Sequence, residues 1–165
     1  MKRFGLWAAF VAGLYVMQSS ILPLLAYHGI SANLLLLLTV SFAFLRGARY
    51  GVLMGFCAGL LQDLATGTFF GVDVFSYMSI GFVCGKFSDQ VFKDQVFLPL
   101  LASIMATVAN YFLLLLFMLL LGYRFQVAFH IQDVLLPMLC WQFAFAYPVH
   151  KATLGMDKYI RERYC

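Results

Sequence analysis

The feature that most constrains this chain is a series of long apolar runs, each ended by charged, glycine or proline residues. A helix needs about 20 apolar residues to cross the hydrocarbon core of a bilayer. Six runs approach that length, and we expect one transmembrane helix in each: 4–25, 30–45, 50–64, 72–85, 96–121 and 134–149. The stretch 151–165 that follows is short and charged. The pattern predicts an all-α integral membrane protein, a compact bundle of about six transmembrane helices.

Composition agrees with lipid as the main solvent. The chain is 64% hydrophobic and 11% charged, whereas soluble domains carry about 25% charged residues. Its 165 residues leave little beyond the helices, so we expect a single polytopic membrane domain over 1–165. The first run exceeds the 7–15 apolar residues typical of a signal peptide, and we expect it to stay as a membrane anchor. Lys and Arg stand singly or in pairs beside apolar runs, which does not favour nucleic acid as a partner.

The distribution of positive charge predicts the orientation, because Lys and Arg concentrate in short cytoplasmic loops. With the N-terminus in the cytoplasm, only Arg124 of the 11 Lys and Arg residues lies outside. The inside residues are Lys2, Arg3, Arg46, Arg49, Lys86, Lys93, Lys151, Lys158, Arg161 and Arg163. We therefore expect a multi-pass protein of the inner membrane with both termini in the cytoplasm. The second to fourth spans are short, which indicates either a thinned or partly re-entrant centre or snorkelling of Arg46 and Arg49.

Small residues recur every fourth position in three of the predicted spans. One helix face then lacks side chains, and a neighbouring backbone can approach closely. The third span has Gly51, Gly55 and Gly59, the fourth has Gly81 and Gly85, and the first has Gly5, Ala9 and Gly13, with a second pair at Ala8 and Ala12. These stripes serve either packing within the bundle or docking of a partner's transmembrane helix.

A few polar residues fall at membrane depth. Asp63 lies near the outer end of the third span, beside Gln62, and needs a partner there. It either accepts hydrogen bonds from amides of the following turn or meets a cation on an associated protein. Asn110 and Gln142 lie near the middle of the fifth and sixth spans. We expect them to join helices by hydrogen bonds, or to form an interior polar pocket with aromatic neighbours.

Signals of catalysis are missing from the sequence. It contains no GxSxG, no HExxH, no Walker loop and no pair of carboxylates at membrane depth. No two cysteines have the spacing of a CxxC metal site. We expect neither a catalytic residue, nor a metal, nor a cofactor.

The middle of the chain resembles the MreD family of rod shape-determining proteins. The similarity is carried by Leu45-Arg46-Gly47-Ala48-Arg49-Tyr50-Gly51, Gly55-Phe56, Gly59-Leu60-Leu61-Gln62-Asp63-Leu64, Gly67, Gly71, Tyr77, Gly81 and Gly85. It covers residues 30–90 by motif and the whole chain by length and number of spans. On this resemblance Arg46, Gly51, Gly55, Gly59, Asp63, Gly81 and Gly85 are candidates for partner binding or helix packing.

The resemblance implies a non-enzymatic scaffold of the cell-elongation complex. Such proteins pair with the bitopic protein MreC and work beside MreB, RodA and a class B penicillin-binding protein in lateral peptidoglycan synthesis. Their fold is similar to the substrate-binding components of energy-coupling-factor transporters, and a vitamin-binding transport subunit is therefore the alternative. A vitamin binder needs convergent polar groups at its outer mouth, and the outer connections here offer few.

Overall fold

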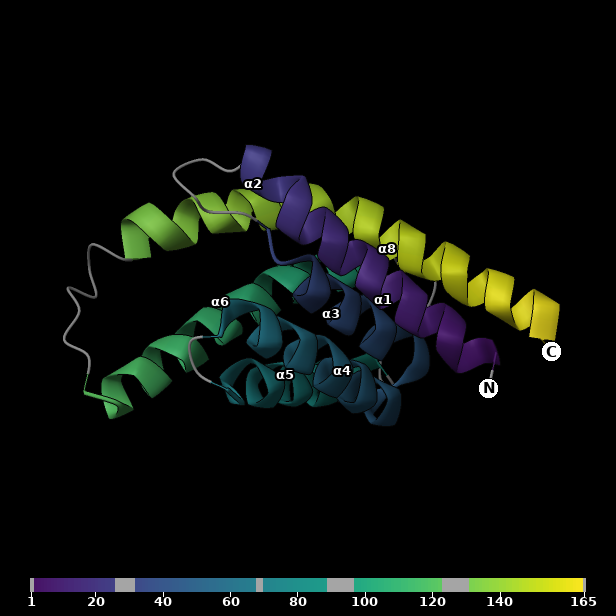
Figure 1. The fold of residues 1–165 in the computed structure, drawn as a ribbon, viewed down its shortest axis with the longest axis horizontal. Coiled ribbons are helices and arrows are strands. Elements are labelled where there is room, and N and C mark those ends of the chain that lie inside the picture. Colours follow the sequence, from purple (N-terminus) through teal and green to yellow (C-terminus); the bar gives the residue numbers. More distant parts are fainter. Residues whose placement is uncertain (1, 26–31, 68–69, 89–96, 123–130, 165) are drawn as a thin grey trace.

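The described part of the chain is entirely helical. The computed structural model describes residues 2–25, 32–67, 70–88, 97–122 and 131–164, and no strand occurs among them (Figure 1). The helices are α1 (Lys2–Ser20), α2 (Leu22–Leu25), α3 (Leu34–Arg46), α4 (Ala48–Thr66), α5 (Val72–Ser88), α6 (Phe97–Leu120), the π-helical turn η1 (Ile131–Leu135) and α8 (Leu136–Tyr164).

The described part of each predicted span is mostly helical, with α1 followed by the short α2 in the first, and the main difference concerns the end of the chain. The stretch predicted as a short charged tail continues α8, which runs for 29 residues. Charge ends an apolar run but not a helix, because Ala, Leu, Met, Lys, Glu and Arg after Lys151 are all good helix formers. Two residues of the orientation argument, Lys93 and Arg124, lie outside the described residues.

Two helical segments of the described chain are long and apolar enough to cross a membrane by themselves. They are Gly5–Leu24 and Phe97–Leu120, while Leu34–Arg46 is apolar but shorter. Helix α3 has 13 residues and is about 20 Å long, whereas the hydrocarbon core is about 30 Å thick. Length and hydropathy alone thus support two crossings, and the other four predicted crossings rest on the sequence pattern.

Helix α3 forms the centre of the bundle. All ten residues from Leu34 to Ala43 are buried, so no face of this helix reaches the surface. It contacts α1, α4, α5, α6 and α8. A helix that is apolar all round is expected in such a position.

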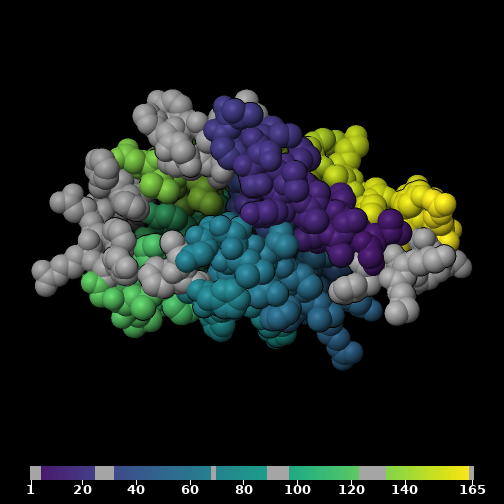
Figure 2. Space-filling model, viewed as in Figure 1, coloured from purple at the N-terminus to yellow at the C-terminus, as the bar shows by residue number. Residues whose placement is uncertain are grey.

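The remaining helices surround α3. Helices α4 and α5 form an antiparallel hairpin that makes the most extensive contact in the molecule. Helix α1, purple in Figure 2, lies across one face of the bundle. The N- and C-terminal ends lie at the same end of the molecule (Figure 1). Both termini can therefore lie on one side of a membrane.

Candidate functional site

The glycine stripe of α4 faces α5 at close range. A Cβ atom added to Gly51 would lie 2.5 Å from the carbonyl oxygen of Gly81, and one added to Gly55 would lie 2.5 Å from that of Tyr77. Ordinary van der Waals contact begins at about 3.4 Å, so neither position has room for a side chain. The two backbones approach each other because both helices present glycine at the crossing.

The same close approach extends along both helices. A Cβ at Gly59 would lie 2.6 Å from Cα of Val74. In the other direction, Gly85 faces the backbone of Ala48 and Gly47. All five glycines of the two stripes are buried. Of the two functions considered for the stripes, packing within the chain is the one that this geometry shows, and the stripe of α4 is not open to a partner.

Asp63 on α4 caps the N-terminus of α5. Its carboxylate accepts hydrogen bonds from the backbone amides of Gly71 at 2.9 Å, Asp73 at 3.1 Å and Val74 at 3.1 Å. The first amides of a helix have no partner within it, and its N-terminus carries partial positive charge. Asp63 is only 2% exposed, and these three hydrogen bonds offset the free-energy cost of burying its side chain. Its backbone carbonyl also accepts from Gly67, which ends α4 in the left-handed conformation.

The N-terminus of α3 is capped by its own N-cap residue and by side chains from two other helices. Asn33 accepts from the amide of Leu36 at 3.1 Å, as an N-cap residue does. Gln18 on α1 accepts from the amide of Leu35 at 3.2 Å. Gln142 on α8 accepts from the amide of Asn33 at 2.9 Å and donates to its carbonyl at 3.2 Å. The start of α3 is buried away from water, so these side chains supply the hydrogen bonds that its first backbone amides need.

This polar layer extends to α4 and α5. The Gln18 side chain donates to Gln62 at 3.0 Å, and the Asn33 amide donates to the hydroxyl of Tyr77. Five helices or helix ends thus meet through side-chain hydrogen bonds. Gln62 and Gln142 stand out in the sequence as polar residues at membrane depth, but their positions could not indicate which residues they pair with.

The predicted pair Asn110 and Gln142 is buried, at 2% and 0% exposure. Gln142 joins α8 to the start of α3 by hydrogen bonds to the backbone of Asn33. Joining helices is one of the two roles predicted for it. Within the described ranges the Oδ1 atom of Asn110 has no hydrogen-bond partner. Neither residue lines the two apolar cavities described below.

Arg46 is held by an ion pair within the chain. Its Nε donates to Oδ1 of Asp157 at 2.7 Å, and its Nη2 lies 2.6 Å from the same oxygen. Arg161 reaches the other carboxylate oxygen at 3.1 Å. The Asp157 side chain is 6% exposed and that of Arg46 is 27% exposed. Asp157 was missed in the sequence because it lies in the stretch predicted to be a simple charged tail.

The small residues of α1 differ from those of α4 and α5, because no other described helix packs closely against them. A Cβ added to Gly5 or Gly13 would meet no atom within 4 Å, and Ala9 between them is exposed. We call Gly5, Ala9 and Gly13 the α1 stripe. Unlike the stripe on α4, it is open on the surface of the described chain.

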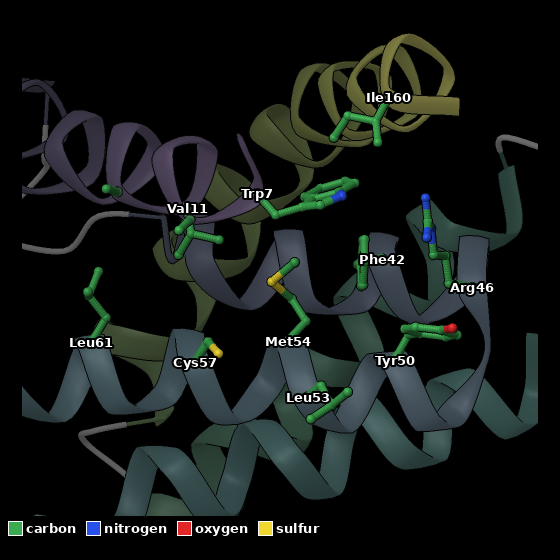
Figure 3. A pocket seen from close by; sticks show the side chains of 12 residues that line it. Trp7, Val11, Phe42, Arg46, Tyr50, Leu53, Met54, Cys57, Leu61 and Ile160 are labelled. Carbon is green, nitrogen blue, oxygen red and sulfur yellow. The ribbon is translucent and has the colours of Figure 1, made fainter. Parts of the chain in front are cut away.

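Two of the cavities lined by described residues are apolar. One, of about 420 Å³, lies between α1 and α4 and is lined also by α3 and α8 (Figure 3). We call it the α1 groove; its lining residues are Trp7, Ala8, Val11, Ala12, Phe42, Arg46, Tyr50, Leu53, Met54, Cys57, Leu61 and Ile160. The other, of about 650 Å³, lies between α5 and α6 with Phe44 of α3. Arg46 is the single charged residue among the lining residues of both.

A comparison with models of protein families shows to which family the chain belongs. The model of the rod shape-determining protein MreD matches residues 1–151. The chain belongs to the MreD family. Membership and the apolar helices make it a membrane protein with a role in rod shape determination.

The family match covers every residue of the resemblance seen in the sequence, while Asp157 and Arg161 lie beyond its end. No curated protein and no solved structure gives a significant match. The expected likeness of the MreD fold to the substrate-binding components of energy-coupling-factor transporters is therefore without support from a solved structure. Within the described residues, no three His, Cys, Asp or Glu side chains form a group that could hold a metal ion.

Proposed function

We propose that this MreD-family protein is a non-enzymatic membrane scaffold that binds an MreC-like bitopic partner. Through that partner it works in a complex with MreB, RodA and a class B penicillin-binding protein, and helps to control lateral peptidoglycan synthesis. The family match supports the role in cell shape. The polar side chains at membrane depth also support it, because Asp63, Gln142 and Asn33 are engaged in hydrogen bonds that hold helices together.

The observation that carries the partner-binding part is the open α1 stripe. Transmembrane helices associate through small residues that let their backbones approach, without help from a hydrophobic driving force. The stripes on α4 and α5 pack against each other. At Gly5 and Gly13, by contrast, an added Cβ would meet no described atom within 4 Å. We place the transmembrane helix of the partner on this stripe.

The proposed orientation has both termini in the cytoplasm of a multi-pass inner-membrane protein. Ten of the 11 Lys and Arg residues support it by their order along the chain. The common position of the two ends in Figure 1 is compatible with it.

The transport subunit is not favoured by these features. A vitamin site needs polar groups that converge on an open pocket. Here the amides of Gln18, Gln62 and Gln142 bind each other or the start of α3, and both cavities are apolar.

A matched pair of variants tests the proposal. Ala9→Leu places a branched side chain on the α1 stripe, whereas Ala12→Leu, also on an exposed position of α1, places it in the α1 groove. We expect Ala9→Leu to abolish co-purification of the MreC-like protein at a normal membrane level, and cells relying on it to become round or wide. Ala12→Leu should retain the partner. Normal co-purification and normal rods with Ala9→Leu would refute docking on this stripe.

Depletion of the protein tests the wider function. Rod cells should lose their shape, because wall insertion along the cylinder loses its scaffold. Unchanged rods that acquire a vitamin requirement would favour the transport subunit instead.

A further inference from the structure

The α1 groove has the shape of a site for a single hydrocarbon chain. Along α4 it runs from Tyr50 to Leu61, which corresponds to about 16 Å of helix. One leaflet of a bilayer has a hydrocarbon depth of about 15 Å, half of the core thickness. The groove is open to the surface, since Ala8, Ala12 and Cys57 in its wall are exposed. It is therefore as long as one leaflet is deep.

The volume of the groove is sufficient for one acyl chain. Carbon atoms in contact are about 4 Å apart, so an extended polymethylene chain is 4 to 5 Å wide and fills roughly 300 Å³ over the length of the groove. The cavity of about 420 Å³ accommodates such a chain.

Charge is confined to one end of the groove. Arg46 lies there, near Ile160, while Leu61 lies at the opposite end (Figure 3). The guanidinium is partly exposed, and its Nη1 takes no part in the ion pair with Asp157. Arg46 and Arg161 share the single carboxylate of Asp157, so this cluster keeps a net positive charge. An anionic group is therefore favoured at this end only.

We propose that the α1 groove binds one anionic glycerophospholipid of the inner leaflet. Its phosphate pairs with Arg46, and one acyl chain extends along the wall formed by Ala8, Ala12 and Cys57 towards Leu61. Assignment to the inner leaflet rests on the proposed orientation, in which Arg46 is cytoplasmic. The bound acyl chain takes the place of bulk lipid along α1. It adds contacts between α1 and α4, which the Gln18–Gln62 hydrogen bond already joins.

The fluorescence of a native tryptophan can report which lipid lies in the groove. Of the two tryptophans, Trp7 lines the groove and packs edge-on against Phe42, with ring centroids 4.5 Å apart. Trp141 lies on α8 outside it, so Trp141→Phe leaves Trp7 as the only indole. Acyl chains brominated at their centre quench indole fluorescence on contact. Quenching of this variant in vesicles therefore reports which lipid occupies the groove.

The test compares brominated phosphatidylglycerol with brominated phosphatidylcholine, each added in small amounts to vesicles of unlabelled phosphatidylcholine. One basic residue near the surface favours an anionic lipid about fivefold, so phosphatidylglycerol should half-quench Trp7 at about one fifth of the concentration. Ala12→Leu should abolish the preference by filling the groove, and Ala9→Leu, about 100° further round the helix from Ala8, should retain it. The triple variant Arg46→Gln/Asp157→Asn/Arg161→Gln removes the net positive charge of the cluster without leaving a buried carboxylate unpaired, and should also lose the preference.

Equal quenching by the two lipids, or a preference that survives Ala12→Leu, would mean contact with bulk bilayer lipid only and would overturn the proposal. The result is separable from that for the proposed function. Loss of the partner follows Ala9→Leu, and loss of the lipid preference follows Ala12→Leu. Either proposal can therefore fail while the other stands.

Discussion

The close crossing of α4 and α5 leads to a prediction with a calculable size. In Gly55→Ala the new Cβ would start 2.5 Å from the carbonyl oxygen of Tyr77. Reaching ordinary contact at about 3.4 Å requires the two helices to separate by about 0.9 Å at this point. Neither atom can move aside alone, because the obstacle is backbone. Overpacking of this kind typically costs about 1–3 kcal/mol.

Replacing glycine by alanine in a helix also contributes about 1 kcal/mol of stability through propensity, which would obscure the result. Gly13→Ala provides the control, because it has the same propensity effect and its Cβ meets nothing within 4 Å. The difference between the two variants should therefore be about 1–3 kcal/mol, with Gly55→Ala the less stable.

The measurement is the free energy of unfolding of the purified protein in one detergent, or the midpoint of thermal unfolding where refolding is incomplete. Gly55→Leu should go further and lower the amount of protein in the membrane. Equal stability of Gly55→Ala and Gly13→Ala would show that the helices do not cross as closely as described. The packing explanation of the glycine stripe would then be wrong.

Three further predictions concern the polar contacts and the orientation. Asp63→Ala should lower stability more than Asp63→Asn, by about 1–3 kcal/mol for the unsatisfied amides at the start of α5; equal loss in both variants of the purified protein would argue against capping. Arg46→Gln and Asp157→Asn should each destabilise, and in a double-mutant cycle should show a coupling of about 0.5–3 kcal/mol; additive effects would mean that the ion pair contributes nothing. Reporter fusions at either end, and labelling at Arg49, should give cytoplasmic signals only, and labelling of Arg49 from outside would reject the proposed orientation.

The positions of the helices could be predicted well because their signals are local. Apolar runs, the Arg46–Arg49 break and the glycines after Thr66 all act within a few residues of the helix ends that they define. Capping was one of the two roles predicted for Asp63, and it could be considered for the same reason, since the amides concerned are only 8 to 11 residues away.

The remaining site could not be predicted because it depends on pairs far apart in the sequence. A small-residue stripe indicates that something packs closely, but nothing local distinguishes the stripe of α4, which meets α5, from that of α1, whose glycines have no close neighbour among the described residues. Gln142 and Asn33 are 109 residues apart, and Arg46 and Asp157 are 111 apart. Pairing over such distances follows from the arrangement of helices in space and has no sequence period.

The buried start of α3 has a consequence for how the chain is made. The backbone amide of its N-cap residue, Asn33, bonds to Gln142, which the ribosome adds 109 residues later. At about 5–20 residues per second, this corresponds to roughly 5 to 20 s during which α3 is already synthesised but its polar end lacks that acceptor. Leaving such groups unsatisfied in lipid is costly, so α3 should settle at its final depth only after α8 has joined it. Chains truncated before Leu136 should accordingly be degraded in the cell faster than full-length chains that carry a single substitution at Gln142, since these keep α8 as a cover for the same end.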